Sequence, residues 1–522
     1  MTKKYSRTRN SIKNISTSLI NQLLLTVLKF ICRTVFIQTL GKSYLGINGL
    51  FSDILTLLSI TELGIDTAMN YKLYKPLAEN DIPRLRVLMK FYKKAYVVIG
   101  LTITGLGLML IPFLPNIIKD YDRLAPLGIN PEFLFLLFLL RSAFSYLFFA
   151  SASAIIKADQ KEYVVYITNF ICSLIMNIVQ IITLLVWSDF LVYVIVAVVF
   201  TILQNLVNAF IAKKRYPLVF AKTSDRLSAA EIKDMFKDLG ALSLGQIQYV
   251  VIKATDNLVL SAFIGLMIVG LYSNYLMIFN TIKTILNKIF SATRSSMGNL
   301  FTSDDVEKEY RIFSVMNFLT VFFYGTAAIG LAVVADELML VWIGEEYIIP
   351  FPFTILMGIE ILNVGMKNII SQVGDVAGVF RQMWYRPLIA IVLNITISVS
   401  LVQVCGIYGV LIGTIVSDLV VSLSINPIVI HKYAFHGRKP VSKYFLKNLT
   451  YFGVICLVGL CDWLLCHSML VGVGWFSVII HMMICGCSLP LVMVILFWRT
   501  EECGYIRQLM VKLIRKLKKT NN

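Results

Sequence analysis

The stretch LLLTVLKFICRTVFI, residues 23–37, is a run of apolar side chains interrupted by two cations, Lys29 and Arg33. It lies within a longer apolar segment, residues 15–39, which exceeds the roughly 20 residues that a helix needs to cross a bilayer. One Lys or Arg at the bilayer centre costs about 2.5–3.5 kcal/mol, so two that lie deep cost roughly 5–7 kcal/mol. A segment that keeps both cations indicates a membrane helix with protein or water along one face.

The whole chain has the composition of a polytopic membrane protein. Of its 522 residues, 57% are hydrophobic and 15% are charged, whereas soluble domains carry about 25% charged residues. The net charge is +18, but the basic residues are dispersed at the ends of apolar segments, which argues against nucleic acid as a partner. We therefore predict an all-α polytopic membrane protein that uses no cofactor.

Apolar stretches recur along the chain, and we predict about fourteen transmembrane helices. With this count, the basic residues before span one and after spans two, six, twelve and fourteen all fall on one side of the membrane. The positive-inside rule then places both termini in the cytoplasm. The predicted spans are residues 15–39, 44–69, 93–118, 132–156, 162–187, 190–212, 239–263, 265–293, 311–334, 350–374, 382–404, 407–430, 447–468 and 472–498.

The loops and the scattered histidines argue against an enzyme. The longest outward loops, residues 118–132 and 335–349, leave no room for a catalytic domain. None of the four histidines pairs with a serine or cysteine in a hydrolase order, and no metal-ligand spacing is present. On the cytoplasmic side, Ser228 and Glu231 have the spacing of a capping box that starts an amphipathic helix.

The chain resembles itself at an offset of 224 residues. LGKSYLGINGLF, residues 40–51, aligns with IGLMIVGLYSNY, residues 264–275, so that Gly41 falls on Gly265 and Gly46 on Gly270. The same offset maps spans one to six onto seven to twelve, which predicts two pseudo-symmetric six-helix lobes around a central cavity. The predicted domains are an N-terminal lobe (1–222), a C-terminal lobe (223–446), and two additional helices with a basic cytoplasmic tail (447–522).

Polar residues recur at helical spacing in several predicted spans and so share one face of each helix. In span one, for example, Gln22, Thr26, Lys29 and Arg33 step by three and four residues. Because such side chains must face protein or water, stripes on several helices predict a shared water-filled cavity. The candidate cavity residues are Lys29, Arg33, Arg141, Lys253, Lys283, Asn280, Asn287, Arg294, Asn177 and Gln180.

Two other interpretations of these cations stay open. Lys and Arg can extend to the headgroups, which fits Arg33 and Arg294 best. Alternatively, intramembrane acids neutralise them. Asp256, three residues after Lys253, is a candidate either for ion coupling or for a simple salt bridge. The acids available for neutralisation are Asp53, Glu62, Asp66, Asp256, Glu360, Asp375 and Asp418.

Three segments resemble bacterial oligosaccharide flippases of the Wzx type, in the multidrug/oligosaccharidyl-lipid/polysaccharide exporter superfamily. Residues 40–94, which begin LGKSYLGINGLFSDILTLLSITELGIDTAMN, resemble their second-span region. Residues 254–275, ATDNLVLSAFIGLMIVGLYSNY, are similar to their seventh and eighth spans, and residues 405–418, CGIYGVLIGTIVSD, to their twelfth.

The resemblance implies a flippase of the bacterial cytoplasmic membrane. Such proteins move an undecaprenyl-pyrophosphate-linked oligosaccharide repeat unit by alternating access, for surface polysaccharide assembly. The implied partners are that lipid-linked oligosaccharide, membrane lipids, polysaccharide assembly proteins and a coupling ion, H⁺ or Na⁺. The resemblance also implies a cationic cavity, for which this chain offers Lys29, Arg33, Arg141, Lys253 and Lys283.

Other functions stay open at the level of sequence. A lipid II flippase or a multidrug exporter would have the same fold, although a cavity for cationic drugs favours acids and aromatics over Lys and Arg. A membrane polysaccharide polymerase or ligase fits less well, because it generally needs a large outward loop. A scaffold would leave the polar stripes unexplained.

Overall fold

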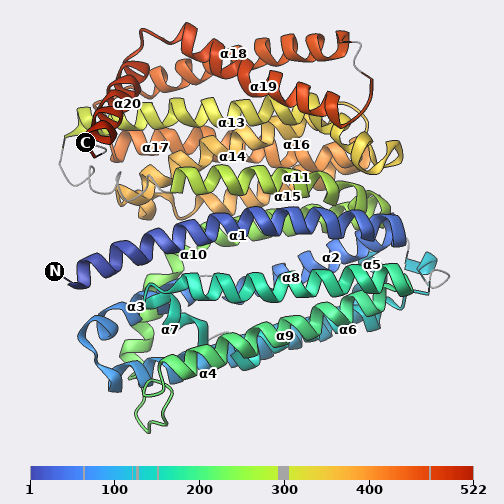
Figure 1. The fold of residues 1–522 in the computed structure, drawn as a ribbon, viewed down its shortest axis with the longest axis vertical. Helices are drawn as coiled ribbons and strands as arrows, with labels where there is room; N and C mark the ends of the chain where they lie inside the picture. Colours follow the sequence, from blue (N-terminus) through green and yellow to red (C-terminus); the bar gives the residue numbers. More distant parts are fainter. Residues whose placement is uncertain are drawn as a thin grey trace. The chain divides into compact units, whose positions relative to one another are not determined.

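The computed structural model describes residues 2–62, 65–119, 121–124, 128–149, 152–291, 305–469 and 472–520. These residues fold almost entirely into helices and contain no strand (Figure 1). Contacts divide the chain into two compact units, Met1–Gly270 (unit 1) and Leu271–Asn522 (unit 2). The prediction of an all-α fold is confirmed.

Many of the helices are long and apolar enough to span a membrane, so the chain is a multi-pass membrane protein. A bent pair, Pro131–Leu147 with Ala152–Ala158, forms one further candidate span. Within the described residues, the predicted spans at 44–69, 239–263 and 265–293 are also mainly helical, although their helices do not meet the same test of length and composition. Within the described residues the candidate spans are Ile20–Leu40, Ile82–Ile117, Glu162–Trp187, Phe190–Arg215, Val306–Ile343, Phe353–Val376, Arg386–Cys405, Ile407–Tyr433, Val441–Ser468 and Trp475–Leu496.

Unit 1 is built from α1 to α10 and the first turn of α11. Side chains cap several of these helices where the sequence places Asp or Asn: Asp81 accepts a hydrogen bond from Arg84 N, and Asn130 accepts one from Phe133 N. Within the unit, α1 packs along α8 and α6 packs along α9 (Figure 1). The helices are α1 (Thr2–Leu40), α2 (Lys42–Leu58), α3 (Ile65–Glu79), α4 (Ile82–Leu110), α5 (Leu114–Ile117), α6 (Pro131–Phe144), α7 (Ala152–Ala158), α8 (Glu162–Trp187), α9 (Phe190–Arg215), α10 (Ala229–Phe263) and α11 (Leu266–Ser291).

The aligned glycines of the internal repeat have matching structural roles. Gly41 ends α1 at φ +84° and Gly265 ends α10 at φ +128°, a backbone region that other residues rarely adopt. Gly46 and Gly270 then make reciprocal close approaches. A Cβ at Gly46 would overlap the carbonyl oxygen of Leu266, and a Cβ at Gly270 would overlap that of Lys42. Since Lys42 and Leu266 are also 224 residues apart, the starts of α2 and α11 cross with local pseudo-twofold symmetry.

Unit 2 contains the rest of α11 and the helices that follow. The pair α15 and α16 packs very closely, because a Cβ at Gly409 or Gly413 would overlap Leu401 or Ser398. The helices are α13 (Val306–Ile343), α14 (Phe353–Val376), η7 (Val379–Met383), α15 (Arg386–Cys405), α16 (Ile407–Ser417), η8 (Asp418–Ile425), α17 (Asn426–Tyr433), α18 (Val441–Ser468), α19 (Trp475–Leu496) and α20 (Glu501–Thr520).

The two additional helices, α18 and α19, are joined to α13 by polar as well as apolar contacts. Asn317 on α13 donates to Asn448 on α18 at 2.9 Å. His481 on α19 lies 2.6 Å from Glu337 on α13. Inside a membrane, hydrogen bonds and close packing hold helices together because lipid supplies little hydrophobic drive. These contacts therefore attach the C-terminal pair to unit 2.

Candidate functional site

Helix α1 exposes two chemically opposite faces. Ile20, Leu24, Val27 and Ile31 are exposed apolar residues, and at 3.6 residues per turn they lie within about 30° of one direction. Lys29 is also exposed, but it points about 170° away from that stripe. The apolar stripe is the face that lipid covers, so the exposed ammonium group of Lys29 lies on the face turned away from lipid.

Arg33, one turn further along this polar face, takes part in a cluster inside unit 1. The phenol of Tyr193 on α9 interacts electrostatically with both Arg33 on α1 and Arg141 on α6. Arg141 Nε also donates to Thr201 Oγ1 at 2.9 Å, and the Tyr193 ring packs edge-on against Phe36, with centroids 5.0 Å apart. Three helices thus bring two guanidinium groups near one tyrosine.

Two of the predicted cavity residues are engaged within the helix pair α8–α9. Asn177 is buried and donates to the carbonyl of Ser173 in its own helix at 2.7 Å. Gln180, 3% exposed, donates to the carbonyl of Tyr193 at 3.2 Å. Each of these side-chain amides donates a hydrogen bond to a backbone carbonyl inside the unit, because a buried polar group needs a partner. Gln180 therefore acts as a support for the segment that holds Tyr193.

Lys253 and Asp256 lie on α10 in unit 1, beside an acid on α2. Asp53 interacts electrostatically with Lys253 and accepts a hydrogen bond from Asn257. Asp256 is buried, 8% exposed. The α2–α10 contact therefore combines a cation with carboxylates.

Unit 2 contains a cluster in which cations and acids are matched. Lys367 Nζ on α14 lies 2.6 Å from Asp418 Oδ2 on η8, and Ser422 Oγ donates to the other carboxylate oxygen at 2.9 Å. Glu360, two turns before Lys367, interacts electrostatically with Asp418, Lys367 and Lys283. Lys283 on α11 also lies over the ring of Phe279, 6.0 Å from its centroid. Two ammonium groups and two carboxyl groups thus share one region.

The remaining predicted residues have different surroundings. Asn287 accepts hydrogen bonds from Tyr324 Oη at 2.6 Å and from Asn368 Nδ2 at 2.7 Å. Asn280 is half-buried on the same helix, one turn before Lys283, and Asn280 and Asn287 both point away from the exposed apolar residue Ile289. Arg294 lies outside the described residues.

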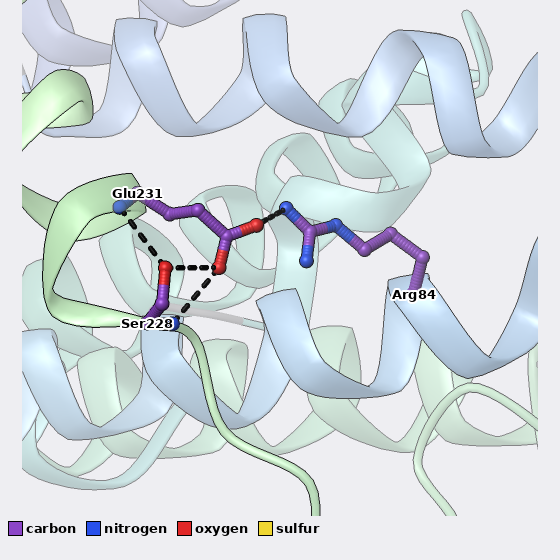
Figure 2. Close-up of polar contacts among 3 residues, drawn as sticks. All are labelled: Arg84, Ser228 and Glu231. Carbon is purple, nitrogen blue, oxygen red and sulfur yellow. Dashed lines mark hydrogen bonds and ion pairs between the residues drawn. The ribbon is translucent and has the colours of Figure 1, made fainter.

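A second group of basic residues fixes the segment that leads into α10, and Figure 2 shows one of them, Arg84, with Ser228 and Glu231. Ser228 and Glu231 form the expected capping box, and the Glu231 carboxylate also lies 2.5 Å from Arg84 Nη2 at the start of α4. Hydrogen bonds from Ser228 N, Arg84 and Ser228 Oγ lower the pKa of Glu231 to about 2. Arg86 Nε and Lys90 Nζ bind the carbonyls of Leu218 and Thr223. Residues 218–231 are therefore held on α4.

Sequence reasoning missed two central residues, Tyr193 and Lys367. Tyr193 is an ordinary aromatic residue in an apolar helix, and only the packing of α1, α6 and α9 brings it to the two arginines. Lys367 carried a signal, since it lies seven residues after Glu360 and therefore on the same helix face.

The fold is shared with solved membrane transporters. No protein-family model matches the chain, and no curated protein matches it in sequence. It is similar to the lipid II flippase MurJ in an inward closed conformation, at 16% identity over 93% of this chain and 99% of that one, with a TM-score of 0.60. It is also similar to an inward-facing multidrug resistance MATE family transporter of the MOP superfamily, at 15% identity over 82% and 100%, with a TM-score of 0.55.

An outward-facing structure of such a MATE family transporter matches at 14% identity over 83% of this chain and 97% of that one, with a TM-score of 0.53. At these identities the likeness shows a common fold. The chain therefore has the fold of multi-pass membrane transporters and flippases.

Proposed function

We propose that the protein is a flippase that moves an undecaprenyl-pyrophosphate-linked oligosaccharide across the cytoplasmic membrane by alternating access. The observation that carries this proposal is the polar face of α1, where Lys29 is exposed opposite the lipid-facing stripe and Arg33 joins Arg141 at Tyr193. A pyrophosphate group carries several negative charges, and Lys and Arg bind phosphate oxygens strongly where water is scarce.

The distribution of charge gives unit 1 the larger part in binding the headgroup. Arg33 and Arg141 lie near the phenol of Tyr193, which is hydrogen-bonded to Cys32, whereas Lys283 and Lys367 lie among acids. Lys253 lies beside Asp53 and contributes less positive potential. In this arrangement the oligosaccharide and pyrophosphate cross in a hydrated cavity while the polyprenyl chain stays in lipid. Asp256 and the acids of unit 2 are the groups available for coupling to H⁺ or Na⁺.

A lipid II flippase is the second candidate, because the chain shares its fold over nearly the full length with MurJ. Lipid II also presents a pyrophosphate, so the basic cluster would serve either substrate. A multidrug exporter is a weaker candidate, because a cluster of guanidinium groups repels cationic drugs.

Translocation in liposomes tests the proposal directly. The purified protein is reconstituted with a fluorescently labelled polyprenyl-pyrophosphate oligosaccharide, and its appearance on the opposite leaflet is followed over time. Lys29→Ala is expected to lower the rate about tenfold, the effect of losing about 1.4 kcal/mol of binding, and Lys253→Ala is expected to lower it less. Lys94→Ala removes an exposed cation at the cytoplasmic part of α4 and serves as the matched control.

Labelled lipid II in the same vesicles separates the two candidate substrates. Faster crossing of lipid II than of the polyprenyl-linked oligosaccharide would favour the second candidate. An unchanged rate in Lys29→Ala for both lipids, with normal folding, would exclude the polar face of α1 from the mechanism.

A further inference from the structure

Arg386, the first residue of α15, is a buried cation whose guanidinium group is only partly hydrogen-bonded. It is 1% exposed, which makes it one of the largest fully buried side chains in the described residues. Its Nη1 donates to the side-chain oxygen of Asn426 on α17. Its Nε and Nη2 have no hydrogen-bond partner among the described residues. A buried N–H group of a charged side chain without a partner is costly, so this arrangement calls for a ligand.

The two nitrogens without partners form a specific recognition edge. In a guanidinium group, Nε–H and one N–H of Nη2 point the same way and meet two oxygens of a phosphate or carboxylate in a bidentate pair. Nη1, which donates to Asn426, is not part of this edge. Its hydrogen bond fixes the rotation of the guanidinium group. Arg386 is therefore held with its bidentate edge directed away from Asn426.

The surroundings of Arg386 are those of a membrane–water boundary. The adjacent Trp384 and Tyr385 are 54% and 40% exposed, and their rings meet edge-on with centroids 6.1 Å apart. Interfacial Trp and Tyr mark the level of lipid headgroups. Further along α15, Leu388 and Val392 are exposed apolar residues of the lipid face. The N-terminus of the 20-residue helix α15 adds a positive dipole end at the same level.

We propose that Arg386 binds a phosphate group through Nε and Nη2, with Asn426 as the residue that positions it. The ligand class is a phosphate group, and its sources are the phosphodiester headgroup of an anionic phospholipid in the adjacent leaflet or soluble inorganic phosphate. The buried state of Arg386 means that side chains covering it move when the ligand enters. This site lies in unit 2, at the end where α15 begins, and is independent of the flippase function proposed for the basic cluster of unit 1.

Thermal unfolding of the full-length protein tests the site with defined probes. One arm titrates inorganic phosphate against sodium chloride of equal ionic strength in detergent. The other compares nanodiscs of phosphatidylglycerol with nanodiscs of phosphatidylcholine. A phosphate-dependent rise of the unfolding midpoint identifies soluble phosphate as a ligand, and a rise only with phosphatidylglycerol identifies the lipid headgroup.

The variants separate specific binding from general electrostatics. Arg386→Lys keeps the charge but removes the bidentate edge, and is expected to raise the half-saturating concentration of the active probe about tenfold. Asn426→Ala is expected to raise it in the same direction while leaving Arg386 in place. Arg438→Gln removes an exposed arginine from the segment after α17 and is the matched control.

The proposal is overturned if neither probe raises the midpoint of the wild-type protein above its ionic-strength or phosphatidylcholine control. It is also overturned if Arg438→Gln weakens the effect as much as Arg386→Lys does. If Arg386→Lys does not fold, an unchanged response of Asn426→Ala overturns it instead, because that variant frees the guanidinium rotation without removing the charge.

Discussion

In unit 1 the guanidinium groups of Arg33 and Arg141 both interact with the phenol of Tyr193, whereas in unit 2 the ammonium group of Lys367 is held 2.6 Å from the carboxylate of Asp418. Both units thus place cations among helices, but acids lie beside Lys367 in unit 2 and beside Lys253 in unit 1, whereas Arg33 and Arg141 lie near a tyrosine. A matched cluster holds helices together, while an excess of positive charge creates a demand for an anion. Under the proposed function, the same kind of polar stripe serves structure at Lys367 in unit 2 and ligand binding near Tyr193 in unit 1.

The largest expected effect concerns the matched cluster. Lys367→Met leaves the Asp418 side chain, 1% exposed, without its cation, and is expected to lower the free energy of unfolding by about 3–5 kcal/mol. The double variant Lys367→Met/Asp418→Leu is expected to recover most of this loss, because it removes both buried charges. Thermal unfolding midpoints in detergent measure the effect of the single and of the double variant. Arg141 in unit 1 donates to Thr201, and among the described residues it forms no ion pair, so Arg141→Met is expected to lower the free energy of unfolding much less. An equal loss would contradict the contrast between the two clusters.

The crossing of α2 and α11 offers a second test, one that concerns the repeat itself. Gly46→Ala and Gly270→Ala each place a Cβ onto a facing carbonyl oxygen, and each is expected to cost about 1–3 kcal/mol from overpacking. Gly49→Ala is the control, because its Cβ would lie at an ordinary 3.8 Å from Val269 Cγ1. If Gly49→Ala lowers the unfolding midpoint as much as Gly46→Ala and Gly270→Ala do, the result would argue against the reciprocal contact.

The third prediction concerns transport rather than stability. Arg33→Met and Arg141→Met are each expected to lower translocation of a polyprenyl-pyrophosphate substrate about tenfold while changing the unfolding midpoint little. Because both arginines meet Tyr193, the double variant is expected to lose less than the product of the two single losses. Liposome assays of the three variants measure this coupling. Fully multiplicative losses would show that the two guanidinium groups act at separate places.

Much of the fold followed from the sequence, because hydropathy and charge alternation report directly on a membrane environment. The repeat was visible in its glycines, because Gly41 and Gly265 have a positive φ, and Gly46 and Gly270 approach a facing carbonyl too closely for a Cβ. The surroundings of the candidate residues were less accessible. Helical spacing placed Asn177 and Gln180 on a polar face, but it could not show that α9 covers that face. Nor could spacing identify Tyr193, whose role depends on three helices distant in sequence.

The smallest expected effect lies at the surface, where Glu231 and Arg84 attach the start of α10 to α4 (Figure 2). Hydrogen bonds lower the pKa of Glu231 from 4.5 to about 2, so the folded state favours its ionised form. The stabilisation is therefore fully present above pH 4.5, and it is lost as the pH falls from 4.5 through 2. Glu231→Gln is expected to flatten this part of the pH profile of the unfolding midpoint and to leave the midpoint at pH 7 slightly lower.

The side chains of Arg84 and Glu231 are each 40% exposed, so salt screens their attraction. The difference in midpoint between wild type and Glu231→Gln is therefore expected to shrink in 1 M NaCl. A variant that keeps the wild-type slope between pH 4.5 and 2 would show that other carboxylates, such as those of unit 2, dominate the acid response.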